Sequence, residues 1–501
     1  MRPASGERRV EKLTFESIIG LLDSIIWSTP LIVLCLGAGL YFSLRTRFMQ
    51  VRGVKEMIRL MFTGQSSAAG VSSFQALAMS LSGRVGTGNI AGVATAIAFG
   101  GPGAVFWMWM VAFLGASTAY VESTLAQIYK EKDDKGLYRG GPAYYIEKAM
   151  GLKWYAWLFA VVTVIATGFL LPGVQANSIA SGLNNAFGIA PAVTAAGVVI
   201  VLGFIIFGGV KRIARFAEIV VPFMALAYIL VALVVMFINI QQVPEIFMLI
   251  IKSAFGMEAG FGAVLGLAVQ WGVKRGVYSN EAGQGTGPHA AAAAEVSHPA
   301  KQGYVQAFSI YVDTLLVCSA TAFLILSTGM YNVYDPASPI DPATGLHTGY
   351  LVQQLQGVVH GPGFAQSAVE SVLPGFGQIF VALALLFFAF TTIVAYYYMA
   401  ETNITYINRK VHRPWLVFLL RIGIMAAVTY AAIGSVGTAW SLGDIGVGMM
   451  AWLNIIAILI LQRPALKALK DYESQKKAGK EPEFDPQALG IRNAKFWEKR
   501  D

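Results

Sequence analysis

The chain has 501 residues, of which 56% are hydrophobic and only 13% are charged, and its formal net charge is +9. Soluble globular proteins carry roughly 25% charged residues, so the composition excludes an ordinary soluble protein and indicates an integral membrane protein. The positive charge does not indicate nucleic-acid binding, because the basic residues lie in loops between apolar segments. We therefore expect membrane lipid, and no nucleic acid, as a partner.

Apolar runs of ~20 residues can cross a hydrocarbon core about 30 Å thick, and they predict an all-α protein with eleven membrane segments. The first run is too long to be a cleaved signal peptide, and many others follow it. A short amphipathic stretch, residues 53–62, suits the membrane surface. The predicted segments are residues 19–44, 72–99, 102–129, 155–184, 191–208, 213–238, 258–295 (interrupted), 301–330, 376–407, 415–434 and 438–462.

The distribution of Lys and Arg predicts the orientation. Basic loops follow the first, third, fifth and ninth segments, and the tail after Gln462 is also basic, whereas residues 331–375 contain no Lys or Arg. The positive-inside rule then places the C-terminus in the cytoplasm and the N-terminus outside. The basic stretch Arg2–Lys12 opposes this orientation, but the loops outnumber it. We expect a multi-pass protein of the plasma membrane, which is the inner membrane in a bacterium or archaeon.

Two predicted segments are interrupted near their centres, at residues 82–89 and 274–287. Each glycine weakens a helix by ~1 kcal/mol relative to alanine, and unwound backbone is tolerated in a membrane only where it lines an enclosed cavity. Discontinuous helices at corresponding positions of two halves indicate the binding site of a secondary transporter. Without the first segment, the breaks fall in the first and sixth of ten, which fits a five-plus-five inverted repeat. The predicted units are residues 1–71, 72–238, 239–462 and 463–501.

The breaks also indicate a ligand. The half-helix that begins at Thr87–Asn89 presents free N–H groups and a positive dipole end, which suit a carboxylate. Unwound carbonyls around Ser82–Val85, with nearby side-chain oxygens, suit a hard monovalent cation. Polar residues also interrupt the fourth segment at Gln175 and the ninth at Thr391–Thr392. A carboxylate at one break and an ammonium at the other make an amino acid the expected ligand.

Ionisable residues at membrane depth are costly and need a partner or a wet cavity. Arg84, Glu281 and Asp313 lie among small or polar residues, which favours a functional role. For Glu122, Glu401 and Arg421 we favour structural ion pairs. The Arg84 guanidinium needs a partner, and the candidates are Glu281, Asp313 and Asp444. Arg84, Glu281 and Asp444 are also candidates for a gate or an ion pair.

Alternative functions fit less well. Gly86–Ala91 matches the Gly-x-Gly-x-x-Ala dinucleotide pattern, but no strand precedes it and it lies inside a membrane segment. A small-residue packing face at Gly88 and Gly92 would explain close packing but not the polar residues. A membrane enzyme is a distant alternative, because the histidines have no metal-ligand spacing. We expect a protein that is not an enzyme and has no cofactor.

Five runs of residues together are specific: 85–97, 100–109, 175–178, 279–283 and 388–392. With these runs, the chain resembles the alanine or glycine:cation symporter family (sodium:alanine symporters) from about Trp27 to Gln462. The resemblance implies a LeuT-type fold with one extra N-terminal helix. It also implies uptake of alanine or glycine by alternating access, driven by a cation gradient that is usually Na⁺.

The resemblance also implies site residues. The substrate carboxylate is expected at Gly86, Thr87, Gly88, Asn89 and Gln175. The amine and side chain are expected at Ser279, Asn280, Gly283, Thr392 and Tyr396. One sodium ion is expected at the carbonyls of Ser82 and Val85 and the hydroxyls of Thr391 and Thr392, and a second at Asn89 and Asp313.

One departure concerns Ala395–Tyr396, where many relatives read Gly-Trp. Tyrosine changes the volume of the pocket and adds a hydroxyl, so glycine, L-alanine and D-alanine all stay open as substrates. Proton coupling, with Asp313 or Glu281 as the proton carrier, is the alternative to sodium coupling. Stoichiometry, oligomeric state and the role of residues 331–375 are left open by the residues.

Overall fold

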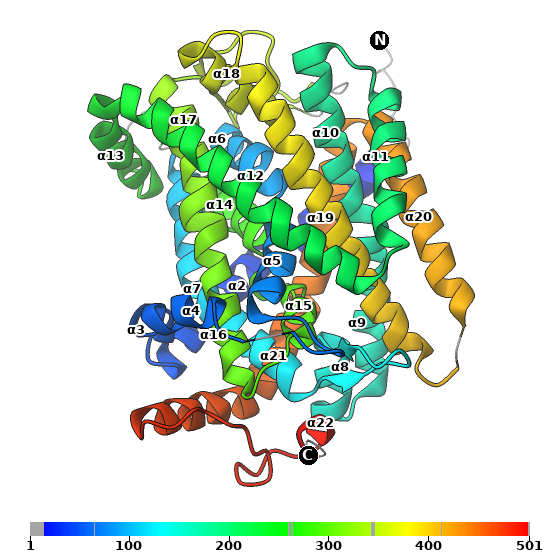
Figure 1. Cartoon of the computed structure of the whole chain (residues 1–501). Helices are drawn as coiled ribbons and strands as arrows, with labels where there is room; N and C mark the ends of the chain where they lie inside the picture. Colours follow the sequence, from blue (N-terminus) through cyan, green and yellow to red (C-terminus); the bar gives the residue numbers. More distant parts are fainter. Residues whose placement is uncertain are drawn as a thin grey trace, which may run out of the picture.

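The structure, a computed structural model, describes residues 15–64, 66–258, 261, 264–341, 346–411 and 413–498. It is mostly helical (Figure 1). Within the described residues, eight helical spans are long and apolar enough to cross a membrane, which confirms a multi-pass membrane protein. These spans are Phe15–Arg45, Gly103–Ile128, Lys153–Phe187, Val210–Ile238, Pro299–Thr328, Gly377–Asn408, Pro414–Ile433 and Val436–Lys477. The basic stretch Arg2–Lys12 lies outside the described residues.

Several of these spans are single helices that match one predicted segment each. The shorter apolar helix α11 corresponds to the fifth predicted segment. Helix α21 extends well past Gln462, where the last predicted segment ends, and therefore includes the start of the predicted tail. The single helices are α7 (Gly103–Ile128), α11 (Pro191–Ile206), α12 (Val210–Ile238), α19 (Gly377–Asn408), α20 (Pro414–Ile433) and α21 (Val436–Lys477).

Three other spans are each made of two helices in succession. The first is divided at Trp27–Ser28, and Pro30 lies in the first turn of the helix that follows. The other two contain π-helical turns, η3 (Ala166–Leu170) and η6 (Tyr311–Cys318). π-Helical turns are frequent at functional sites. The helix pairs are α1 (Phe15–Ile26) with α2 (Thr29–Arg45), α9 (Lys153–Ile165) with α10 (Leu171–Phe187), and α16 (Pro299–Ile310) with α17 (Ser319–Thr328).

Both predicted interruptions are present. Helix α5 (Ser73–Arg84) ends, and the chain resumes in the π-helical turn η1 (Gly88–Gly92) and α6 (Val93–Gly100). Helix α14 (Leu265–Asn280) ends before a loop that leads into α15 (Gly287–Ala293). In that loop Glu281 has φ +59°, and Gly283 and Gly285 have φ +82° and +87°. Left-handed backbone favours glycine, so the two glycines permit the loop, whereas Glu281 adopts a strained conformation.

The two interrupted helices lie side by side. Helix α6 packs on α14, and α15 packs on α5. The two interrupted helices therefore run in opposite directions. Helix α7 covers α14 and α15, while α12 and α19 cover α5. Helix α10 packs along α19 (Figure 1). Both breaks are consequently enclosed by protein, as unwound backbone in a membrane requires.

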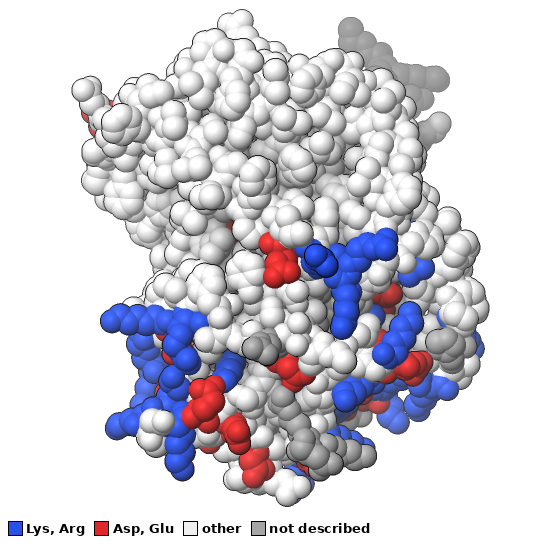
Figure 2. Space-filling model, in the orientation of Figure 1, with Lys and Arg blue, Asp and Glu red and all other residues white. Residues whose placement is uncertain are grey.

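The two ends of the molecule differ in charge. On the face drawn in Figure 2, Lys and Arg side chains lie in the lower part, and the upper part is nearly uncharged. We call the lower end the basic end. It includes α3 (Met49–Arg52) and α4 (Val54–Met61), of which α4 corresponds to the predicted amphipathic stretch at residues 53–62. It also includes a short hairpin, β1 (Glu131–Lys132) and β2 (Tyr138–Arg139), and the C-terminal helix α22 (Lys495–Glu498).

The opposite end carries three further elements. The long loop at residues 331–375 forms the hairpin β3 (Asn332–Tyr334) and β4 (Tyr350–Gln353), followed by α18 (Pro362–Val372). In the hairpin the strands are antiparallel, and Asn332 pairs with Gln353. Helix α13 (Val243–Ala254), preceded by the turn η4 (Ile240–Gln242), packs on α7.

Candidate functional site

The first break is held open by two side-chain oxygens. The Gly86 N–H donates to Asn89 Oδ1 at 2.8 Å, and the Thr87 N–H donates to Gln175 Oε1 at 3.0 Å. Gln175 comes from α10, so the fourth predicted segment reaches the break as expected. The Thr87 hydroxyl is buried and has no hydrogen-bond partner among the described residues. Both N–H groups of the break are therefore held by side-chain oxygens, and the Thr87 hydroxyl is the donor there that has no partner among the described residues.

Asp313 connects the two breaks. Its Oδ1 accepts from Asn89 Nδ2 at 2.7 Å, and its Oδ2 accepts from the Ser279 hydroxyl at 3.0 Å. The neighbouring Thr314 hydroxyl donates to Oδ2 at 2.6 Å. Asp313 is fully buried in η6. These donors are all neutral, so the carboxylate can still balance the charge of a cation.

Oxygen atoms also gather beside the end of α5. The Thr392 hydroxyl donates to the Ser82 carbonyl at 2.8 Å and lies 3.5 Å from the Val85 carbonyl. The Thr391 hydroxyl bonds the Phe388 carbonyl of its own helix, which Thr392 also bonds at 3.0 Å, and lies 3.9 Å from Met224 Sδ. The structure thus brings together Ser82, Val85 and Thr392, and places the Thr391 hydroxyl away from them. All-oxygen ligand sets suit hard cations.

Glycine is required at the first break because its neighbours approach closely. A Cβ atom added at Gly86 would lie 2.4 Å from Thr392 Oγ1. One added at Gly88 would lie 3.2 Å from the Ser279 Cα atom, in the second interrupted helix. The glycines allow α19 and α14 to approach the break, which places the oxygen atoms named above around it.

The predicted residues of the second break divide into two groups. Ser279 faces Asp313, as described above. Asn280 Oδ1 accepts the Ala282 N–H at 3.0 Å, and its Nδ2 has no partner in the described part of the chain. The Gly283 N–H donates to Glu122 Oε1 at 3.3 Å. Gly283 therefore faces α7 and lies apart from the Asn89–Asp313 pair.

Glu122 acts as a brace for this second break. Besides Gly283, it accepts a hydrogen bond from Asn454 Nδ2 at 2.7 Å, and the same Nδ2 donates to the Gly283 carbonyl at 2.9 Å. The Tyr145 hydroxyl donates to Asn454 Oδ1. We expected Glu122 to form a structural ion pair, but the groups that it bonds, the Gly283 N–H and the Asn454 amide, are neutral.

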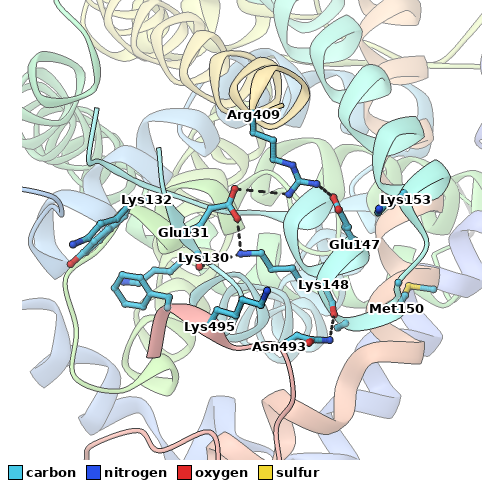
Figure 3. Close-up of a pocket in the computed structure, with 14 residues that line it drawn as sticks. Lys130, Glu131, Lys132, Glu147, Lys148, Met150, Lys153, Arg409, Asn493 and Lys495 are labelled. Carbon is cyan, nitrogen blue, oxygen red and sulfur yellow. Dashed lines mark hydrogen bonds and ion pairs between the residues drawn. The ribbon is translucent and has the colours of Figure 1, made fainter. Parts of the chain in front are cut away.

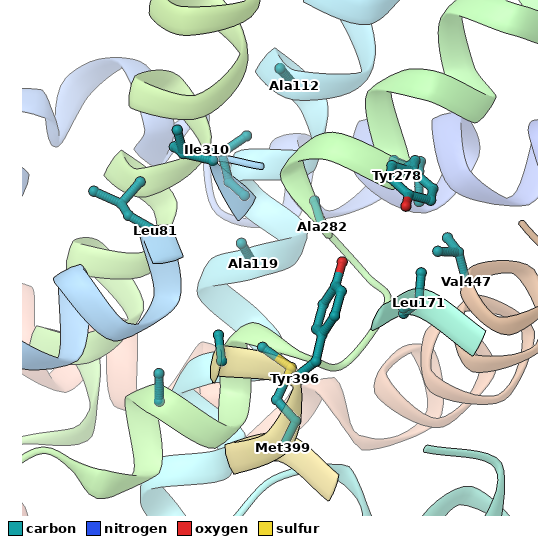
Figure 4. Close-up of a cluster of buried hydrophobic side chains, with 14 of the residues drawn as sticks. Leu81, Ala112, Ala119, Leu171, Tyr278, Ala282, Ile310, Tyr396, Met399 and Val447 are labelled. Atoms are coloured by element: carbon teal, nitrogen blue, oxygen red, sulfur yellow. The ribbon is translucent and has the colours of Figure 1, made fainter. Parts of the chain in front are cut away.

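Tyr396 and Tyr278 lie near the second break. Figure 4 shows the Tyr396 side chain extending from α19 toward Ala282, with Tyr278 beyond it. Tyr396 is 1% exposed, and no hydrogen bond of its hydroxyl occurs within the described residues. A buried phenol usually has a partner, so this hydroxyl is available to a ligand.

Arg84 has neutral partners. Its Nη1 donates to Gln306 Oε1 at 3.1 Å and to the Ser309 hydroxyl. Of the three expected partners, Asp444 instead forms ion pairs with Lys274, at 2.9 Å, and with Arg275. Glu281 accepts from the Thr286 hydroxyl at 2.9 Å, and Asp313 bonds the residues given above. The Nε and Nη2 atoms of Arg84 have no partner in the described ranges.

The site is covered toward the uncharged end. Gln175 Nε2 donates to the Tyr278 hydroxyl at 3.4 Å, and the Tyr278 ring lies 5.1 Å from that of Trp440. The Arg275 guanidinium stacks 4.5 Å above Trp440. Trp440 also lines a cavity of about 360 Å³, together with Asn177, Ser178, residues 357–360 and the first two turns of α18. Tyr278 and Trp440 therefore separate this vestibule from the first break.

A second cover lies toward the basic end. Arg139 forms ion pairs with Asp133 at 3.0 Å and with Glu401 at 3.5 Å, and it donates to the Thr402 hydroxyl at 3.0 Å. The Tyr398 hydroxyl donates to the His289 carbonyl at 3.2 Å. The β1–β2 hairpin and α19 thereby close over α15.

Sequence reasoning did not identify Tyr278, Thr314 or Cys318 as site residues. The Cys318 Sγ atom lies 3.2 Å from the Ser279 hydroxyl and 3.4 Å from Asn89 Nδ2. Tyr278 directly precedes the Ser279-Asn280 pair, and Thr314 directly follows Asp313. Their position next to a predicted site residue could therefore have identified Tyr278 and Thr314. No such signal in the sequence pointed to Cys318.

A sequence model of the sodium:alanine symporter family matches residues 12–486 of the chain. The chain is 63% identical to YrbD of Bacillus subtilis (strain 168) over 96% of its length and 97% of that protein, whose name describes a sodium/proton-dependent alanine carrier. It is 56% identical to the "Sodium/proton-dependent alanine carrier protein" of Bacillus sp. (strain PS3), over 88% of the chain and 97% of that protein.

A more distant relative has a similar name, and one solved structure has a similar fold. The chain is 36% identical to the "Sodium/alanine symporter AgcS" of Methanococcus maripaludis, over 93% of the chain and 99% of that protein. Among solved structures, a manganese transporter mutant of Eremococcus coleocola matches with a TM-score of 0.50 and 12% identity, over 87% of this chain and 88% of that one. That likeness concerns the fold alone. The chain belongs to the sodium:alanine symporter family.

Proposed function

We propose that the protein is a sodium-coupled symporter that takes up a small neutral amino acid, alanine or glycine, by alternating access. The observation that carries this proposal is the Asp313 carboxylate, which bonds Asn89 of one break and Ser279 of the other. An anionic group at the junction of two discontinuous helices can bind a cation there and link its binding to the geometry of both helices. The names of the relatives support alanine and sodium as cargo.

The proposed substrate position lies at the first break. The substrate carboxylate accepts the Gly86 and Thr87 N–H groups and replaces the oxygens of Asn89 and Gln175, which accept them here. The substrate ammonium lies toward the second break, near Ser279 and Asn280. The amide and hydroxyl oxygens there are its natural acceptors.

The proposed sodium positions use the oxygen clusters already described. One ion binds the Ser82 and Val85 carbonyls and the Thr392 hydroxyl, which rotates its proton away to present a lone pair. A second binds Asp313 and the side-chain oxygen of Asn89. Because each cluster joins residues of different helices, the ions stabilise the helix arrangement that also binds substrate, and linkage makes this coupling reciprocal.

Alternating access requires that one cover opens at a time. The Tyr278–Trp440 cover lies on the path from the vestibule, and the Arg139–Glu401 cover lies on the path to the basic end. We place the basic end in the cytoplasm and the N-terminus outside, from the positive-inside rule. The broken helices in the first and sixth of ten core segments support a LeuT-type five-plus-five repeat with one extra N-terminal helix.

Proteoliposomes with an imposed sodium gradient test this function. We expect accumulation of labelled alanine, abolished when choline replaces Na⁺. Failure to accumulate either alanine or glycine under a sodium gradient would refute the proposal. Uptake retained in choline with an imposed pH gradient would show proton coupling instead. Competition by glycine, both alanine enantiomers and serine then defines the substrate, for which the volume of Tyr396 is the expected determinant.

A further inference from the structure

A cavity of about 1150 Å³ lies at the basic end, and no described residue of either break lines it (Figure 3). Four stretches that are distant in sequence form its walls. They are the β1–β2 hairpin with Lys130, the turn before α9 from Glu147 to Lys153, Arg409 at the end of α19, and the C-terminal stretch from Asn493 to Phe496. None of these residues takes part in the proposed transport site.

The two carboxylates of this cavity are already paired. Glu131 lies 2.8 Å from Lys148 Nζ and 4.0 Å from Arg409, and Glu147 bonds the same Arg409 guanidinium. Figure 3 shows these pairs linking the hairpin, Arg409 and the turn before α9. Among the described residues, Glu131 and Glu147 are the only acidic side chains that line the cavity, and Lys148 and Arg409 balance their charges.

Three further lysines that line the cavity take no part in these ion pairs. Lys132, Lys153 and Lys495 are exposed, and no carboxylate of the described residues pairs with them. Each comes from a different wall: the hairpin, the start of α9 and the start of α22. Like charges that face one concave space repel, and they focus a positive potential that attracts an anion.

The C-terminal wall is firmly docked, so Lys495 belongs to a formed cavity. Lys130 Nζ lies 4.2 Å from the Tyr138 ring centroid and 4.6 Å from that of Phe496. The Trp497 indole donates to the Gln127 carbonyl at 2.9 Å. Asn493 Nδ2 donates to the Lys148 carbonyl, also at 2.9 Å.

The edge of the cavity meets the membrane surface. Lys153 begins a candidate membrane span. Its neighbours Leu152, Trp154 and Trp157 are 39%, 66% and 46% exposed. Exposed tryptophans at the end of a membrane helix mark the headgroup layer. Lys153 is consequently placed at the depth of lipid phosphates.

We propose that this cavity binds a phosphate-bearing anion, attracted by the positive charges of Lys132, Lys153 and Lys495 around it. Lysine binds phosphate as a mobile point charge, and basic pockets at membrane surfaces bind lipid headgroups. The phosphate is supplied by an anionic phospholipid of the adjacent leaflet or by soluble phosphate. Once bound, it ties the C-terminal stretch to the hairpin and to α9. Binding is independent of transport, so this proposal and the proposed function can fail separately.

The test compares phosphatidylglycerol with phosphatidylcholine in nanodiscs of the full chain, by native mass spectrometry and thermal unfolding, with inorganic phosphate and pyrophosphate as a soluble arm. Preferential retention of phosphatidylglycerol and a raised Tm would support the lipid source. Stabilisation by soluble phosphate, without a lipid preference, would support the soluble source. A wild-type protein with neither response would overturn the proposal.

A triple variant, Lys132→Ala, Lys153→Ala and Lys495→Ala, should weaken anion binding on the order of 100-fold, at roughly fivefold for each lysine. The matched control is Lys470→Ala, Lys477→Ala and Lys480→Ala, because these lysines are exposed and do not line the cavity. It should bind like wild type. The triple Lys→Arg variant keeps the charges and should retain binding. Equal loss in the cavity and control variants, or equal loss in the alanine and arginine variants, would overturn the proposal.

Discussion

The Asn89 side-chain amide donates to the Asp313 carboxylate at 2.7 Å, across 224 positions of sequence. Ser279 donates to the same carboxylate at 3.0 Å. One buried negative charge therefore holds both interrupted helices in register. A change in the charge balance at Asp313 changes both breaks together, which is what coupling between a cation and a substrate requires.

The first prediction concerns this charge. Asp313→Asn keeps the side-chain size but removes the negative charge, and we expect apparent sodium affinity to fall by roughly 10–100-fold, from ~1.5–3 kcal/mol per charged hydrogen bond. Sodium titration of alanine binding to the purified protein measures it. Thr314→Val removes a neutral donor only and should have a smaller effect. An unchanged sodium titration in Asp313→Asn would exclude Asp313 from the ion site.

The second prediction uses two glycines of the first break. Gly86→Ala places a methyl group 2.4 Å from Thr392 Oγ1, whereas at Gly92 the nearest atom, in Trp440, is 3.7 Å away. We expect Gly86→Ala to reduce transport by roughly 5–150-fold, since overpacking costs roughly 1–3 kcal/mol, and Gly92→Ala to stay near wild type. Initial uptake rates in proteoliposomes, normalised to reconstituted protein, decide this. Comparable losses in both variants would contradict the geometry.

The third prediction separates two adjacent threonines. The Thr392 hydroxyl faces the Ser82 carbonyl, and the Thr391 hydroxyl faces its own helix and Met224. Thr392→Val should raise the sodium concentration for half-maximal uptake by about tenfold, the loss of one hydroxyl ligand. Thr391→Val should leave it within about twofold, and Thr392→Ser should rescue it. If Thr391→Val has the larger effect, the ion lies elsewhere.

The fourth prediction concerns the brace at the second break. In Glu122→Gln, an amide N–H2 replaces one acceptor oxygen, so either the Gly283 or the Asn454 donor loses its partner. The free energy of unfolding should fall by about 1–3 kcal/mol, measured by chemical unfolding in detergent. Glu498→Gln, at an exposed position of α22, is the control and should be neutral. A fully stable Glu122→Gln would show that the brace does not hold the loop.

The fifth prediction concerns pH, at the junction of α18 and α19. The Glu370 carboxylate accepts the Gly375 N–H at 2.6 Å and the Gln378 N–H at 3.1 Å, and these bonds hold its pKa below the usual value. Because the pKa is lowered, these bonds stabilise the turn at pH values above the usual glutamate pKa, and this stabilisation is lost as pH falls through the lowered pKa. Hydrogen exchange of the Gly375 and Gln378 amides should accelerate there, after correction for intrinsic rates.

The control for this turn is Glu370→Gln, which cannot titrate. Its exchange at these two amides should be the same above and below the transition, and at neutral pH it should be faster than in wild type because a neutral acceptor is weaker. Pronounced pH dependence in Glu370→Gln would assign the transition to another group.

The positions of the membrane helices and of both breaks could be predicted from the sequence, because each depends on local properties. Runs of ~20 apolar residues can be recognised in the sequence, and so can glycine clusters that weaken a helix. The predicted interruptions at residues 82–89 and 274–287 overlap the observed ends of α5 and α14. Gln175 also reaches the first break as expected.

The tertiary structure alone decided which side chains meet. Successive residues of a helix point about 100° apart, so the packing of α19 against α5, and not the Thr391-Thr392 pair itself, selects the hydroxyl that faces Ser82. Asp444 was an expected partner of Arg84, yet the fold places it beside Lys274 and Arg275. Contacts over hundreds of residues depend on how helices pack, and the sequence of one chain does not encode that packing locally.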